Sequence, residues 1–196
     1  FTDTEQTDPE IGISEGLLSR LRGKDKMPKV IYTNTASEYW RGDGALLHTS
    51  VDGTQDIKVP DNVRIYQFGG VQHDSGIYPL TNESPFDDMR MQHSFNTVEY
   101  YPLLRSLLVR LDRWITKKEP PPPSKHPRID DSTAVEPQRT EQVFKRIPSV
   151  NFPGHLRHID RYDFGTNARD GIVEILPPKV GKPYRTFVSA VDEDGN

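Results

Sequence analysis

The chain has 196 residues, which is enough for one domain or for part of a larger one. Its formal net charge of −4 offers no positively charged surface for nucleic acid. Cysteine is absent, which excludes disulfides, thiolate metal sites and cysteine nucleophiles. No run of apolar residues approaches the length of a membrane span.

The first part of the chain, residues 1–27, is a polar lead-in. Its one apolar group, "GLLSRL", predicts a short amphipathic helix. The chain begins with Phe1 rather than Met and stops abruptly after "VDEDGN". We therefore expect it to be part of a longer protein.

Residues 28–118 carry the clearest secondary-structure signals. The β-branched and aromatic runs "VIYT" and "VRIYQF" predict two buried strands, at 30–33 and 63–68. Between them, "EYWRGDGALLHTS" predicts a short helix, although its glycines weaken the pattern. Strands that alternate with helices indicate an α/β fold with a mostly parallel sheet.

The strongest helix signal is "EYYPLLRSLLVRLDRWITKK". Pro102 is tolerated only in the first turn, so the helix is expected to begin near Tyr100. Apolar residues recur at three- and four-residue steps and predict a face that packs on the sheet: Tyr101, Leu104, Leu107, Leu108, Leu111, Trp114 and Ile115.

Residues 119–196 differ in composition from the rest. They hold eleven of the seventeen prolines and show little periodicity. We expect a proline-rich extension with a few short strands that wraps the domain. "EPPPP" at its start is expected to act as a stiff spacer or, alternatively, as a polyproline ligand.

Two strands cannot cover both faces of a parallel sheet or hide its edges. The α/β unit is therefore expected to be the C-terminal part of a larger domain. Its sheet edge needs the upstream half of that domain, or another chain, to cover it.

Two titratable side chains follow the two expected strands. Glu38 comes just after the first strand and His73 just after the second, and parallel strands bring such loops to the same rim. A carboxylate bound to one imidazole nitrogen leaves the other nitrogen free to act as a general base. The alternatives are that Glu38 caps the following helix, that Asp43 is the acid, and that His73 is an ordinary turn residue.

The segments "PKVIYTNTASEYWRGDGALLHTSVDGT" and "VRIYQFGGVQH" resemble the C-terminal half of α/β-hydrolase domain proteins of the "EYW…QH" type, a group of esterase-like hydrolases. The resemblance continues through "LLRSLLVRLDRWI", "PPPSKHPRIDD" and "VDEDGN". It implies a triad in the order nucleophile, acid, histidine, with Glu38 as the acid and His73 as the base. The implied substrate is a small-molecule ester, and no cofactor is implied.

The serine nucleophile of such a triad belongs on a strand–serine–helix elbow of the G-x-S-x-G type. We expect no such elbow before Glu38, so the nucleophile and the oxyanion hole are expected upstream of this chain. The competing hypothesis is an inactive fragment or interaction module with no enzymatic role.

Other candidate residues carry weaker signals. Tyr39 and Trp40 are expected to pack in the interior or, alternatively, to line the substrate pocket. His155 and His158 have a spacing found in metal sites, but they lack a helical frame and a glutamate base, so no metal is expected.

Overall fold

The computed structural model describes residues 2–21, 23, 27–84 and 88–195. Part of the lead-in expected over residues 1–27 therefore lies outside the described residues. At the centre, β3 (Val30–Asn34) and β4 (Val63–Gln67) pair in parallel. Between them the chain forms α1 (Ala36–Arg41) and the 3₁₀ turn Gly44–Leu47.

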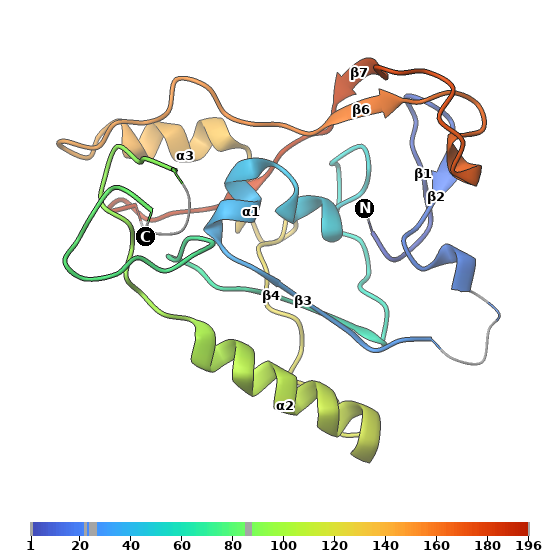
Figure 1. Cartoon of the computed structure of the whole chain (residues 1–196), viewed down its shortest axis with the longest axis horizontal. Helices are drawn as coiled ribbons and strands as arrows, with labels where there is room; N and C mark the ends of the chain where they lie inside the picture. Colours follow the sequence, from blue (N-terminus) through green and yellow to red (C-terminus); the bar gives the residue numbers. More distant parts are fainter. Residues whose placement is uncertain (1, 22, 24–26, 85–87, 196) are drawn as a thin grey trace.

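The long helix α2 (Tyr101–Lys117) follows β4, so the order strand, short helix, strand, long helix is the one predicted. Its N-cap is Tyr100 and Pro102 stands in the first turn, as expected. In Figure 1, α1 lies above the β3–β4 pair and α2 lies below it. None of the helices in the described part of the chain is long and apolar enough to cross a bilayer.

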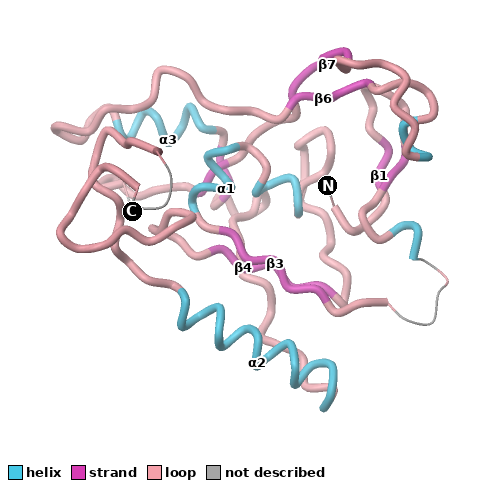
Figure 2. Tube along the Cα trace, in the orientation of Figure 1, coloured by secondary structure: helices cyan, strands magenta, loops and turns pink. Residues whose placement is uncertain are grey.

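The sheet is less parallel than predicted. Among the described residues, β3–β4 is the only parallel pair of strands, and one isolated parallel bridge joins Tyr66 to Lys125. The other two-stranded sheets are antiparallel and separate from it (Figure 2). They pair β1 (Gln6–Thr7) with β2 (Ser14–Glu15), β5 (Ala134–Val135) with β8 (Val188–Ser189), and β6 (Asp160–Asp163) with β7 (Lys179–Pro183). The apolar group "GLLSRL" forms one 3₁₀ turn, Ser19–Leu21, instead of the helix predicted there.

The C-terminal extension contains a helix that was not predicted, α3 (Pro137–Phe144). The extension also covers one edge of β4. The N–H of Gln67 donates to the carbonyl of Lys125 at 2.8 Å, and the N–H of Lys125 donates to the carbonyl of Ile65 at 2.9 Å. This segment therefore continues the sheet beyond β4.

Two groups of buried side chains form the core. One lies on β4, where Val63 and Ile65 pack with Leu18 of the lead-in; full burial of such side chains contributes roughly 1.5–3 kcal/mol each. The other joins the α1 region to the extension and consists of Tyr39, Ala45, Ala134 and Phe187. Residues after 119 thus supply part of the interior.

The apolar face of α2 is less buried than predicted. Only Trp114 is buried, and its ring lies under the cationic ends of Lys29 and Arg64, 4.7 and 4.9 Å from its centroid. Leu108 is 66% exposed and Ile115 51% exposed. Periodicity identified an amphipathic helix correctly, but β3 and β4 alone are too narrow to cover its apolar face.

Candidate active site

The carboxyl ends of β3 and β4 meet because the two strands pair in register, with Asn34 opposite Gln67. Two further backbone hydrogen bonds join the loops beyond them. The N–H of Phe68 donates to the carbonyl of Asn34 at 2.8 Å, and the N–H of Ala36 donates to the carbonyl of Val71 at 3.0 Å. The start of α1 and the loop after β4 are therefore held side by side.

Helix α1 begins with a capping box formed by Thr35 and Glu38. The Thr35 hydroxyl accepts from the N–H of Ser37 at 3.2 Å. Glu38 Oε2 accepts from the Thr35 N–H at 2.6 Å and from the Thr35 hydroxyl at 2.8 Å. These bonds fix the Glu38 side chain at the first turn of the helix.

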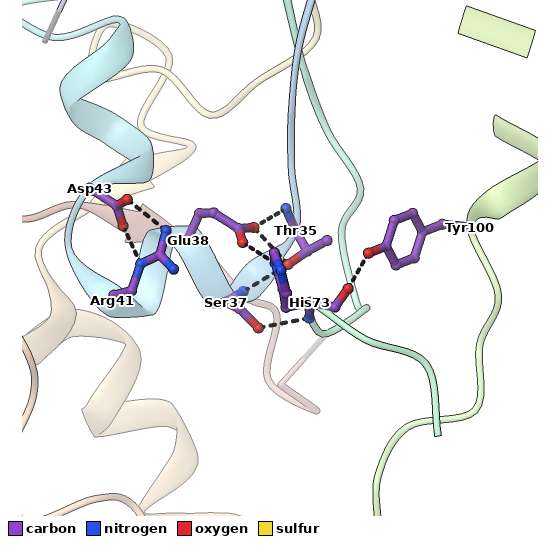
Figure 3. Close-up of polar contacts among 7 residues, drawn as sticks. All are labelled: Thr35, Ser37, Glu38, Arg41, Asp43, His73 and Tyr100. Atoms are coloured by element: carbon purple, nitrogen blue, oxygen red, sulfur yellow. Dashed lines mark hydrogen bonds and ion pairs between the residues drawn. The ribbon is translucent and has the colours of Figure 1, made fainter. Parts of the chain in front are cut away.

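The other oxygen of the same carboxylate faces the histidine. Glu38 Oε1 lies 2.7 Å from His73 Nδ1 (Figure 3). Capping the helix and binding the histidine, which the sequence offered as alternatives, are therefore both done by Glu38. One oxygen serves each purpose.

The pKa of Glu38 reflects competing influences. Burial of the carboxyl raises its pKa, but the hydrogen bonds from Thr35 and His73 together lower it below the ordinary value. A negative charge is thus maintained 2.7 Å from His73 Nδ1.

The His73 ring is open to solvent. Its side chain is 67% exposed, whereas that of Glu38 is 11% exposed. Among the described residues none forms a hydrogen bond with Nε2. This nitrogen is therefore available to a group outside the described part of the chain.

The main chain of His73 is fixed on both sides. Its N–H donates to Ser37 Oγ at 2.9 Å, and its carbonyl accepts a hydrogen bond from the Tyr100 hydroxyl (Figure 3). Tyr100 also packs against Phe68, with ring centroids 5.4 Å apart. Sequence reasoning missed Ser37 and Tyr100 as positioning residues; only Thr35-x-x-Glu38 has a visible signature, the capping-box spacing.

The glycine pair before His73 has one conformationally special member. Gly70 has φ +69°, in the left-handed region, whereas Gly69 is not among the glycines with positive φ. A Cβ at either position would meet no atom within 4 Å. Gly70 is therefore required for its backbone conformation and not for space.

Asp43, the alternative acid, is engaged elsewhere. Both of its oxygens accept from the Arg41 guanidinium, at 2.9 and 2.7 Å, and Figure 3 shows this pair on the far side of Glu38 from His73. The structure brings Glu38 to His73 and keeps Asp43 apart.

The two aromatic residues after Glu38 are packing residues. Tyr39 is 1% exposed, and its hydroxyl lies 3.0 Å from Nε2 of the buried His48, so it does not line an open pocket. Trp40 makes edge contacts with Phe144 and Phe152, with centroids 6.2 and 5.7 Å away. Both side chains join α1 to other parts of the chain.

We expected no nucleophile elbow before Glu38, but residues 12–16, "GISEG", do have the G-x-S-x-G spacing. Ser14 lies in β2 of the β1–β2 hairpin, and its hydroxyl pairs with that of Thr7 at 2.7 Å. Figure 1 places this hairpin beside β6 and β7, at the other end of the molecule from α3. No strand-to-helix elbow surrounds Ser14, so the match to the pattern is not a nucleophile elbow.

His155 and His158 lie close together, with ring centroids 6.3 Å apart. His158 Nε2 contacts Asp160 at 3.2 Å. Within the described residues, no group of three or more His, Cys, Asp or Glu side chains could hold a metal ion.

Comparison with known proteins identifies the family. The sequence model of the protein family described as "Alpha/beta hydrolase domain" matches residues 2–196, nearly the whole chain. No curated protein and no solved structure matches it. The match confirms the resemblance noted in the sequence and agrees with the parallel β3–β4 unit and its flanking helices. The chain therefore belongs to the alpha/beta hydrolase domain family.

Proposed function

We propose that this chain supplies the base and the acid of a serine-type ester hydrolase. The observation that carries the proposal is the 2.7 Å contact between Glu38 Oε1 and His73 Nδ1 at the rim of a parallel strand pair. The exposed Nε2 then acts as the base. It takes the proton of a serine hydroxyl that attacks the ester carbonyl, and later returns a proton to the leaving alcohol.

Glu38 acts by holding the imidazole. Its negative charge stabilises the imidazolium formed when His73 accepts the serine proton. The bonds from Thr35 keep the carboxylate ionised and oriented, so its position does not depend on the exposed histidine. Ser37 and Tyr100 fix the main chain that carries the ring.

The serine and the oxyanion hole come from an upstream part of the domain. The outer edge of β3 has no strand partner among the described residues. Between β3 and α2, Ile31, Leu104 and Leu108 contribute to an apolar hollow of about 270 Å³. An unpaired edge next to exposed apolar side chains favours addition of a further strand and its helix.

The test is His73→Ala in the full-length protein, assayed on a short-chain p-nitrophenyl ester. We expect kcat to fall by about 10³–10⁴-fold with little change in stability, because the ring is exposed. The matched control is His93→Ala, an exposed histidine with no catalytic role here. An unchanged kcat for His73→Ala would overturn the assignment.

The second candidate function is an interaction module without catalysis. It is favoured by the exposed apolar residues of α2, such as Leu108 and Ile115. A serine-directed fluorophosphonate discriminates the two functions. Labelling of the full-length protein at an upstream serine supports the hydrolase, and absence of labelling with intact folding supports the module.

A further inference from the structure

A hollow of about 790 Å³ lies between the α/β unit and the C-terminal extension. This volume is within the usual range for small-molecule sites. Residues 56–59, the end of β4, residues 124–128 and residues near β5 and β8 line it. None of these residues belongs to the Glu38–His73 site, so the hollow has no part in the proposed triad.

The acidic side chains of this hollow, Asp56 and Asp131, accept hydrogen bonds from neighbouring residues of the chain. Asp56 accepts from the N–H groups of Ile129 and Asp130 at 3.1 and 3.0 Å, and Arg128 approaches it to 3.8 Å. Asp131 accepts from the Thr133 N–H at 3.0 Å and from the hydroxyl of the same residue. Asp56 is thus close to a cationic side chain, whereas Asp131 is held by neutral donors and keeps its negative charge.

Two lysines of the hollow, in contrast, have no ion-pair partner among the described residues. Lys58 and Lys125 are exposed and form no ion pair with any described residue. Both residues line the hollow, and each carries one positive charge. The lining holds three cationic side chains, Lys58, Lys125 and Arg128, against the two carboxylates of Asp56 and Asp131, so its net charge is +1.

Two serines add directed donors. Ser124 Oγ accepts from the N–H of Ile65 at 3.1 Å, and Ser189 Oγ accepts from Gln67 Nε2 at 2.7 Å. Each hydroxyl oxygen is thus used as an acceptor and placed by a residue of β4. Its proton is left to donate to another group.

We propose that this hollow binds a small molecule through an oxyanion group, a phosphate or a carboxylate. Lys58 and Lys125 neutralise its charge, and the hydroxyls of Ser124 and Ser189 donate to its oxygens. Charge-assisted hydrogen bonds of this kind are the stronger ones in proteins. The remaining volume, beside Val59 and His126, accommodates the rest of the ligand.

The test is calorimetric titration of the chain with inorganic pyrophosphate and, separately, with citrate at low ionic strength. We expect saturable binding that weakens as salt is added. Tighter binding of pyrophosphate identifies a phosphate ligand, and tighter binding of citrate identifies a carboxylate. Each result supports an oxyanion site.

The decisive variant is the double substitution Lys58→Gln/Lys125→Gln. We expect its affinity for the tighter-binding probe to fall about tenfold, since each exposed charge contributes roughly a two- to fivefold factor. The control Lys117→Gln/Lys179→Gln removes the same charge from exposed positions outside the hollow. Equal affinity of the two double variants, or no saturable binding by the unchanged chain, would refute the proposal.

Discussion

The histidine at the rim of the strand pair and the histidine in the interior of the same α/β unit have opposite surroundings. His73 is largely exposed and lies 2.7 Å from a carboxylate. His48 is fully buried, and its ring stacks on His126 with centroids 4.1 Å apart. Its Nε2 lies 3.0 Å from the Tyr39 hydroxyl, and its buried Nδ1 has no hydrogen-bond partner among the described residues.

The two residues are of the same type, so their different surroundings account for the difference in their properties. The rim histidine faces a carboxylate through one ring nitrogen, and its side chain is largely exposed, which is the arrangement that the proposed base requires. Burial beside a second imidazole opposes protonation, and the pKa of His48 falls to about 3. The interior histidine is therefore a neutral packing group at physiological pH.

The largest expected effect comes from breaking the rim contact. Glu38→Gln keeps the length of the side chain but replaces the charge at His73 Nδ1 with an amide. We expect kcat of the full-length protein to fall by about 10²–10⁴-fold, because the imidazolium loses its stabilising charge and its tautomer is no longer fixed. Steady-state ester hydrolysis measures this.

Asp43→Asn is the matched control, since Asp43 lies five residues further along and pairs with Arg41 at the surface. Such surface pairs contribute about 0–1 kcal/mol, so activity should be retained. A greater loss in Asp43→Asn than in Glu38→Gln would reverse the assignment of the acid.

The expected effect of the interior histidine, His48, is intermediate in size and concerns how stability changes with pH. Because the pKa of His48 is lowered in the folded state from 6.5 to about 3, the unfolded chain binds the additional proton first as pH falls. Neutral His48 therefore makes its full contribution to the free energy of unfolding above pH 6.5, and this contribution is lost as the pH falls from 6.5 to about 3. The loss of unfolding free energy from pH 7 to pH 5 is about 2 kcal/mol.

Urea unfolding at the two pH values measures this loss, and His48→Gln serves as the reference because it cannot titrate. The difference between the two proteins should shrink as pH falls from 7 to 5. Parallel pH profiles for the two proteins would show that His48 does not resist protonation.

The smallest effect concerns the loop that carries the rim histidine. Gly70→Ala places a Cβ on a residue with φ +69°, which costs about 1–2 kcal/mol. Gly69→Ala, at the neighbouring position without positive φ, should leave stability unchanged or slightly raised. Thermal unfolding of both variants checks the contrast, and equal losses would mean that the loop adopts another conformation.

The sequence predicted the central elements well because their signals are local. The β-branched runs around Val30 and Val63 gave the two strands, and Pro102 placed the start of α2. Helix α3 was missed because its apolar residues, Val143 and Phe144, stand together at its end and show no periodicity. What holds it is contact with β8 of the extension, which no local pattern records.

Taken alone, the sequence determined the strand–helix–strand–helix order, the family resemblance, and the positions of Glu38 and His73 after two strands. That Glu38, and not Asp43, meets His73 follows from the folded arrangement of the chain. In-register parallel pairing aligns the two loops, and the capping box turns the Glu38 carboxylate toward the histidine. Burial likewise made His48 a neutral interior residue, because its surroundings come from segments far apart in the chain.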